Sequence, residues 1–284
     1  MGMLAGKVAI VTGGTSGIGK RIVEMFVDEG ANIVAAARRE EEGHQLEQDI
    51  GQQVRFIRTD VSDEKQVQAM IDFALQQFGQ IDCLVNNAAV SLSMSPLVDS
   101  DMEQFDRMIA INYKGALLGM KLVAPHMIAQ RSGSIINISS VASLRSGFSS
   151  HGYSSSKAAV SHLTRSVASD LGPMSIRVNS ISPGGIATGI FGKNAGIEGS
   201  KADRLLDSVK DIFFTLQPIP RSGTTDDIGN AAIFLASDRS TFITGHDLVV
   251  DGGVSLGGMY YAEGIEYRAK MYKEIMVAAA RLND

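Results

Sequence analysis

The sequence predicts an α/β fold in which a doubly wound parallel sheet of about seven strands carries helices on both faces. Short apolar runs alternate with longer stretches of helical periodicity, the order expected when helices connect parallel strands. A glycine-rich turn follows the first run. The chain of 284 residues is long enough for one such domain, although length alone also permits two smaller ones. The seven runs are Val8 to Val11, Ile33 to Ala37, Val54 to Ile57, Ile81 to Val85, Ile135 to Ile138, Ile176 to Ile181 and Asp247 to Val250.

Two of the connecting segments have clear helical patterns. Ile18 to Glu29 has apolar residues three and four positions apart and stops at Gly30, which suits a left-handed C-terminal cap. We expect Ser62 to cap a second helix that ends before Gly79. No linker interrupts the series, so we predict a single domain over residues 1–284. It includes a substrate lid at about 189–215 and a tail at about 259–284.

Charge and cysteine content narrow the possible partners. The formal net charge is −5 without a block of like charges, so we expect neither nucleic acid nor a membrane surface as partner. Cys83 is the only cysteine, which excludes an intrachain disulfide and a metal centre built from thiolates. We predict no metal site and a reducing, cytoplasmic setting. The chain shows no signal-like segment and no apolar run of membrane-spanning length, so we expect neither export nor insertion.

The glycine-rich turn between the first strand and the first helix is suited to a dinucleotide. Gly13, Gly17 and Gly19 permit a tight turn, a close approach of backbone to a pyrophosphate, and close packing of helix on strand. Phosphate then lies at the helix N-terminus. Turns of this kind also occur without a ligand. The small residues after the fourth strand, Asn86 to Ala89, strengthen the interpretation as a dinucleotide site. Asp60 and Val61, after the third strand, are expected beside the adenine, the alternative for Asp60 being an exposed turn residue.

The end of the second strand bears on the choice of dinucleotide. A carboxylate there would bind the ribose hydroxyls of NAD, whereas an arginine pairs with the 2′-phosphate of NADP. The chain has Ala37, Arg38 and Arg39 at this point. NADP is therefore favoured and NAD remains the alternative.

Several separated motifs resemble those of the classical short-chain dehydrogenases/reductases. They are T-G-x-x-x-G-x-G at 12–19, N-N-A-A at 86–89, the asparagine of N-Y-K-G at 112–115, Ser140, Y-S-S-S-K at 153–157 and S-P-G at 182–184. The resemblance covers about residues 5–255. It implies a single Rossmann-type domain, a small-molecule substrate, a homotetramer or homodimer, and a catalytic set of Asn112, Ser140, Tyr153 and Lys157.

The same resemblance implies a set of cofactor contacts. Lys157 would hold the nicotinamide ribose, and residues after the sixth strand would meet the carboxamide and hinge the lid. The predicted cofactor-binding residues are Gly13, Thr15, Ser16, Gly17, Ile18, Gly19, Arg38, Arg39, Asp60, Val61, Asn87, Ala88, Ala89, Tyr153, Lys157, Pro183, Gly184, Ile186 and Thr188.

The catalytic chemistry also follows from the residues themselves. Ketone reduction needs a hydride donor, a proton donor and groups that hold the oxygen. Tyr153 is the candidate acid/base, and Lys157 at i+4 shares its helical face, so we expect its ammonium to lower the tyrosine pKa. Ser140 is the candidate donor to the substrate oxygen, while Ser139 points the other way along a strand. His151 is a weaker acid/base candidate, the alternative being a loop histidine.

These features predict transfer of hydride between a nicotinamide cofactor and a neutral, largely apolar secondary alcohol or ketone. Fixed cations are sparse around the expected carbonyl position, where Arg145 and Lys193 are the candidates. The alternatives are a reductase of 3-oxoacyl thioesters, an isomerase or dehydratase, and a dinucleotide-binding protein without turnover. We expect the tail at about 259–284 either to close the substrate pocket of its own or a neighbouring subunit, or only to have a packing role.

Overall fold

Seven parallel strands form one sheet in the order β3-β2-β1-β4-β5-β6-β7. The computed structural model describes residues 2–91, 94–188, 217–256 and 261–280. All seven predicted strands are confirmed, with ends that differ by up to two residues. The strands are β1 Val8–Thr12, β2 Asn32–Ala37, β3 Val54–Arg58, β4 Cys83–Asn86, β5 Gly133–Ile138, β6 Ile176–Pro183 and β7 Asp247–Val250.

Alternate residues of each central strand pack against two different helical layers. Along β1, Ala9 and Val11 belong to one buried cluster, and Ile10 between them belongs to the other. This alternation follows from the period of two in a strand, and both faces are apolar because helices cover both. Helices α1 and α10 contribute to the first cluster, whereas α3, α5 and α6 contribute to the second. The helices are α1 Gly17–Asp28, α2 Glu40–Ile50, α3 Glu64–Phe78, α4 Met102–Ile109, α5 Gly115–Gln130, α6 His151–Leu171, α10 Thr225–Ala236 and α11 Tyr261–Ala280.

The helix boundaries confirm one cap prediction and correct another. Gly30 follows α1 with a φ of 90°, and Gly79 caps α3 with a φ of 79°, both in the left-handed region that favours glycine. The residue that caps the start of α3 is Asp63, not Ser62 as expected. The Asp63 carboxylate accepts from the backbone N–H groups of Lys65 and Gln66, while the Ser62 hydroxyl donates to Asp60.

The strand order reverses between β1 and β4, and polar contacts join the ends of these two strands. The Thr12 Oγ1 accepts from the backbone N–H groups of Asn87 and Ala88 at 3.0 and 3.1 Å. The Asn87 amide donates to the Thr12 carbonyl oxygen at 2.8 Å. The glycine-rich turn after β1 and the N-N-A-A segment after β4 therefore form one joined edge at the switch point of the sheet.

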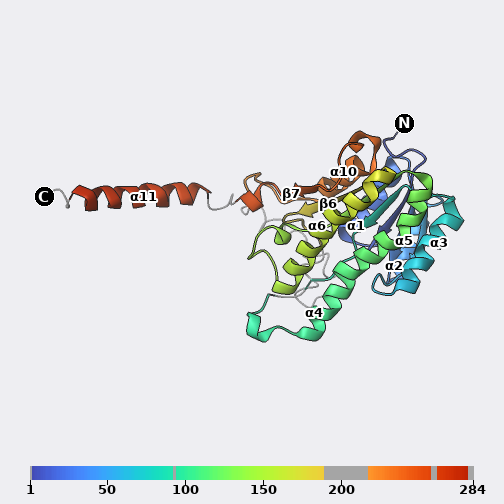
Figure 1. The fold of residues 1–284 in the computed structure, drawn as a ribbon, viewed down its shortest axis with the longest axis horizontal. Coiled ribbons are helices and arrows are strands. Elements are labelled where there is room, and N and C mark those ends of the chain that lie inside the picture. Colours follow the sequence, from blue (N-terminus) through green and yellow to red (C-terminus); the bar gives the residue numbers. More distant parts are fainter. Residues whose placement is uncertain (1, 92–93, 189–216, 257–260, 281–284) are drawn as a thin grey trace.

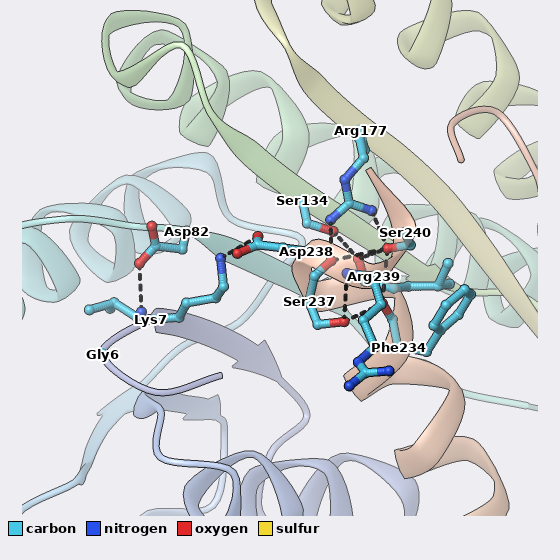
Figure 2. Close-up of polar contacts among 12 residues, drawn as sticks. Gly6, Lys7, Asp82, Ser134, Arg177, Phe234, Ser237, Asp238, Arg239 and Ser240 are labelled. Carbon is cyan, nitrogen blue, oxygen red and sulfur yellow. Dashed lines mark hydrogen bonds and ion pairs between the residues drawn. The ribbon is translucent and has the colours of Figure 1, made fainter. Parts of the chain in front are cut away.

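At the opposite, amino edge of the sheet, a polar cluster attaches the segment after α10 (Figure 2). Arg177 of β6 donates to the Ser240 hydroxyl at 2.7 Å and to the Ser237 carbonyl oxygen at 3.2 Å. The Ser134 hydroxyl of β5 donates to the Leu235 carbonyl at the end of α10. Lys7 pairs with Asp238 at 2.9 Å. These contacts anchor the sheet at the edge away from the predicted site.

The predicted lid lies outside the described residues, and so does part of the predicted tail. The described part of the tail forms α11, which extends away from the α/β body in Figure 1. Its described side chains, such as Ile265, Tyr272 and Met276, are exposed. Among the described residues, no helix is both long and apolar enough to cross a membrane.

Candidate active site

A cavity of about 270 Å³ lies at the carboxyl edge of the sheet, beside the switch point. Most of the residues predicted to contact a dinucleotide meet here although they come from distant parts of the chain. The cavity is lined by Gly13, Thr15, Ser16, Gly17, Ile18, Ala37, Arg38, Arg39, Thr59, Asp60, Val61, Asn87, Ala88, Ala89, Val90, Ile111, Ile138, Tyr153, Lys157 and Thr188.

Four predicted cofactor residues do not line this cavity. Gly19 lies under the turn, where a Cβ would overlap the Gly13 carbonyl oxygen. Pro183 is the last residue of β6. Gly184 packs closely on the backbone of Asp251, since a Cβ on it would lie 2.7 Å from the Asp251 Cα. Ile186 is buried and faces a second cavity of about 300 Å³. The close packing of Gly19 and Gly184 explains glycine at both positions.

The turn after β1 has the shape that a pyrophosphate requires. Gly13 has a φ of 66°, and a Cβ there would lie 2.8 Å from the Asn87 amide nitrogen. Gly17 begins α1 with a φ of 54°, and a Cβ on it would have Thr188 as its nearest contact, at 3.7 Å. A side chain at Gly17 would therefore point towards the cavity residue Thr188, into space that a dinucleotide would use. These residues fit the cofactor that the motifs imply.

The two arginines after β2 differ in their surroundings. Arg39 forms an ion pair with Glu42 at 2.6 Å. Arg38 is exposed on the cavity wall, and its charge acts on Asp60. Burial by itself would raise the pKa of Asp60, but hydrogen bonds from Ser62 and the charge of Arg38 lower it overall. The wall thus presents an ionised carboxylate, Asp60, and a guanidinium, Arg38.

The predicted catalytic residues Ser140, Tyr153 and Lys157 come together next to the cavity. Ser140 follows β5, and its hydroxyl accepts from the Ala142 N–H at 3.1 Å. It also acts on Tyr153, in the first turn of α6, by lowering the tyrosine pKa. Lys157 Nζ lies 5.6 Å from the centre of the Tyr153 ring and donates to the Ile138 carbonyl oxygen at 2.7 Å. Ser139 points into the core, as its position on the strand predicts, and its hydroxyl contacts Ser161.

The pKa of Tyr153 differs from the sequence-based expectation. Burial raises it to about 12, and the hydrogen bond from Ser140 offsets only part of this increase. Burial also lowers the pKa of Lys157 to about 8. The lysine nitrogen lies over the ring face and bonds to a backbone carbonyl, so its charge does not compensate for the lost hydration of the phenolate. The site as described holds a protonated tyrosine, ready to donate.

Asn112 lies in a π-helical turn, Ala110–Lys114, between α4 and α5. Its buried amide accepts from the Val90 N–H at 2.8 Å and donates to the Val90 carbonyl and to the Ser156 hydroxyl. The structure brings its neighbour Ile111, not Asn112, to the cavity wall. The Asn112 side chain therefore holds the segment after β4 against α6. Single π-helical turns such as Ala110–Lys114 are frequent at functional sites.

Two residues singled out in the sequence lie at the margin. His151 is exposed at the start of α6. Arg145 donates to the Ser255 carbonyl oxygen at 2.8 Å. Lys193 lies outside the described residues.

Five cavity-lining residues are not among the predicted cofactor contacts: Ala37, Thr59, Val90, Ile111 and Ile138. Ala37 and Ile138 are the last residues of β2 and β5, and Thr59 directly follows β3. The rule that ligands meet the carboxyl ends of parallel strands was a signal for these three. Ile111 depends on the π-turn, for which the sequence offered no signal.

The chain is similar to known dehydrogenases and reductases over most of its length. A family model described as enoyl-(acyl carrier protein) reductase matches residues 13–255. (+)-Borneol dehydrogenase 2 of Salvia officinalis is 40% identical over 257 residues, 88% of this chain and 89% of that protein. Tropinone reductase-like 2 of Erythroxylum coca is 38% identical over 260 residues, 89% of this chain and 92% of that protein.

A solved structure shows the same architecture. The crystal structure of levodione reductase matches with a TM-score of 0.81 and 29% identity, covering 89% of this chain and 99% of that one. The residues matched by the family model, 13–255, span Gly13 to Gly19, the segment after β4 and Ser140, Tyr153 and Lys157. The chain therefore belongs to the classical short-chain dehydrogenase/reductase family of oxidoreductases.

Proposed function

We propose that this protein transfers hydride between a nicotinamide cofactor and a neutral, largely apolar secondary alcohol or ketone. The observation that carries the proposal is the group of Ser140, Tyr153 and Lys157 beside a cavity shaped for a dinucleotide. A protein that only bound the cofactor would not need a partly buried tyrosine beside a serine and under a lysine.

The cofactor supplies the hydride when it is bound. The glycine turn and the α1 N-terminus would hold its pyrophosphate, with Asp60 and Val61 beside the adenine. Lys157 would hold the nicotinamide ribose. Arg38 favours NADP over NAD because it is the arginine whose charge is not already paired with Glu42.

Tyr153 acts as the general acid in the direction of reduction. Its raised pKa keeps the phenol protonated at neutral pH, so its O–H is available to the alkoxide that forms on the substrate. When substrate is bound, the Ser140 hydroxyl would donate to the same substrate oxygen, beside Tyr153. In the reverse direction the phenolate must form, and a positive charge on Lys157 favours it.

The described residues that follow β4 and β5 support an apolar substrate. Val141 is buried, while Met94, Leu144 and Phe148 remain exposed. Arg145, a candidate for pairing with an anion, already donates to a backbone carbonyl. A carboxylate or phosphate would lose its hydration without a built partner among these residues. The name of one relative agrees, since borneol is a neutral cyclic alcohol.

Following the family resemblance, we also propose a homotetramer, or a homodimer, in the reducing setting of the cytoplasm.

Cys83 is buried, and burial raises its pKa to about 12, so this thiol is a core residue and not a reactive group.

The test is an absorbance assay of reduced nicotinamide with matched panels of neutral cyclic alcohols or ketones and of anionic analogues. We expect turnover with the neutral panel and a higher kcat/KM there. An anionic panel that performs tenfold better would overturn the substrate class. Absence of turnover with both panels, with cofactor binding retained, would favour a binding protein.

A further inference from the structure

A continuous hydrogen-bonded chain of side chains lies behind the catalytic residues, and the proposed reaction does not use it. The hydroxyls of Ser139 and Ser161 are 2.7 Å apart. The Ser161 hydroxyl contacts Asp247 Oδ2 at 3.1 Å, and the Ser182 hydroxyl contacts Asp247 Oδ1 at 2.8 Å. The three serines are buried, each at 3% exposure or less, and the carboxylate that ends the chain is partly buried. Buried hydroxyls of this kind need partners, and Asp247 provides the final acceptor.

This chain contacts the backbone of two proposed catalytic residues. The Ser139 hydroxyl lies 3.1 Å from the Lys157 carbonyl oxygen, and Ser161 follows Lys157 by one turn of α6. Ser143, which is within 3.4 Å of Ser161, donates to the Ser140 carbonyl oxygen at 2.6 Å. The chain therefore joins the segment that carries Ser140 to the helix that carries Tyr153 and Lys157.

Counting protons gives the chain a direction. Each hydroxyl donates one proton, and an ionised carboxylate only accepts. Ser161 and Ser182 must both donate to Asp247, so Ser139 donates to Ser161 at 2.7 Å and not to the Lys157 carbonyl oxygen at 3.1 Å. Asp247 thus sets the orientation of every hydroxyl in the chain, although it lies on β7, the edge strand of the sheet.

We infer that Asp247 is a positioning residue for the reaction: through Ser161 and Ser139 it keeps α6 in place against the end of β5, so that Tyr153 and Lys157 meet Ser140. This inference rests on the proposed function, because it assigns the acid/base role to Tyr153.

The test compares Asp247→Ala with Asp247→Asn. Alanine removes the carboxylate that ties Ser161 of α6 to Ser182 of β6. Asparagine retains an acceptor for Ser182, and its N–H donates to Ser161, so the chain reverses and ends on the Lys157 carbonyl. We expect Asp247→Ala to lower kcat about tenfold, with the KM for the cofactor within about twofold and a larger primary isotope effect from deuterated reduced cofactor. Asp247→Asn should restore kcat and the wild-type isotope effect.

Ser161→Ala provides a second approach in case Asp247→Ala fails to fold. It should lower kcat to a similar degree, and the double variant should be no slower than Asp247→Ala, because both changes break one chain. Ser169→Ala is the matched control, since this hydroxyl of α6 is exposed and bonds only within its own helix. It should leave kcat unchanged.

A crystal structure of each variant gives a readout independent of turnover. In Asp247→Ala, α6 should shift relative to the ends of β5 and β6, whereas in Asp247→Asn it should keep its wild-type position. Folded Asp247→Ala or Ser161→Ala with wild-type kcat, equal losses in the alanine and asparagine variants, or additive losses in the double variant would overturn the inference. A wild type without turnover would instead count against the proposed function.

Discussion

Burial acts on Tyr153 and Lys157 in the same way: it disfavours the charged form of each side chain. The pKa of the tyrosine rises to about 12 and that of the lysine falls to about 8. At neutral pH the pair therefore holds a neutral phenol beside a lysine that is charged but close to its titration point. This arrangement suits proton donation. Oxidation requires the phenolate form of Tyr153 instead, so that direction needs a second positive charge near the pair.

Replacing Tyr153 with phenylalanine removes the proton carrier and leaves the packed ring. We expect Tyr153→Phe to bind cofactor normally and to lose more than tenfold in kcat, which corresponds to more than about 1.4 kcal/mol of barrier. Steady-state kinetics and cofactor titration measure the two properties. Tyr272→Phe, on the exposed face of α11, is the control. A variant that keeps over a tenth of the activity would require another acid.

Lys157 makes stability depend on pH in a defined direction. The folded pKa is about 8 and the ordinary value is 10.5, so between these pH values the unfolded chain binds more protons and the free energy of unfolding rises with pH. Relative to Lys157→Met, the cofactor-free wild type should gain on the order of 3 kcal/mol across this window. Urea unfolding at both ends of the window measures it. A constant difference between the two proteins would contradict the lowered pKa.

Arg38 should determine the cofactor preference. The wild type should have a higher kcat/KM with NADP(H) than with NAD(H), and Arg38→Ala should lose about tenfold or more with NADP(H) alone. Kinetics with both cofactors tests this. Arg165→Ala, on the exposed face of α6, controls for loss of positive charge elsewhere. Equal efficiency with both cofactors in the wild type would refute the assignment.

At the scale of elements, the two edges of the sheet perform different tasks. The carboxyl edge carries the cavity, whereas the amino edge is stabilised by the contacts of Arg177, Ser134 and Lys7 with the segment after α10 (Figure 2). Arg177 is partly buried, and burial lowers its pKa. The ion pair of Lys7 involves Asp238, whose side chain is 83% exposed.

Arg177→Met should therefore destabilise the fold without altering catalysis. We expect a loss of about 2 kcal/mol in the free energy of unfolding, because the variant loses two hydrogen bonds from a partly buried guanidinium. Lys7→Ala should cost less than about 1 kcal/mol, as exposed ion pairs do. Denaturant unfolding gives both values. A change in kcat of the folded Arg177→Met protein would show that the two edges are coupled.

At the scale of the whole molecule, two apolar layers enclose the sheet, and the described side chains of α11 belong to neither. The helix extends from the body in Figure 1, with Ile265, Tyr272, Ile275 and Met276 exposed. The body is thus complete without it.

Removal of residues 257–284 should leave the Tm of the body within about 2 °C, because a change of 1 kcal/mol shifts the Tm of a large domain by only a few degrees. Differential scanning calorimetry provides the measurement. A loss of more than about 5 °C would mean that the tail packs on the body or on another copy. Kinetics of the same variant would show whether the tail closes the pocket.

The sequence by itself determined the seven strands, the glycine turn and the positions of Ser140, Tyr153 and Lys157. These features depend on local patterns: alternation with a period of two, glycine where φ is positive, and an i, i+4 pair on one helical face. The same local logic also placed Asp60, Arg38 and Thr188, each at or soon after a strand end, where the cavity lies.

Only the tertiary structure decided how these residues act together. The π-turn turned Asn112 towards Val90 and Ser156 and brought Ile111 to the cavity, although no local pattern distinguishes such a turn from an ordinary helix. Burial, which depends on the whole fold, raised the pKa of Tyr153 where the sequence predicted a fall. The hydrogen-bonded series from Ser139 to Asp247 joins residues up to 108 positions apart, on two strands, one helix and the residue after β5, and no local pattern relates them. Desolvation and long-range hydrogen bonding arise from the packing of distant segments, so they cannot be deduced from the periodicity of one segment.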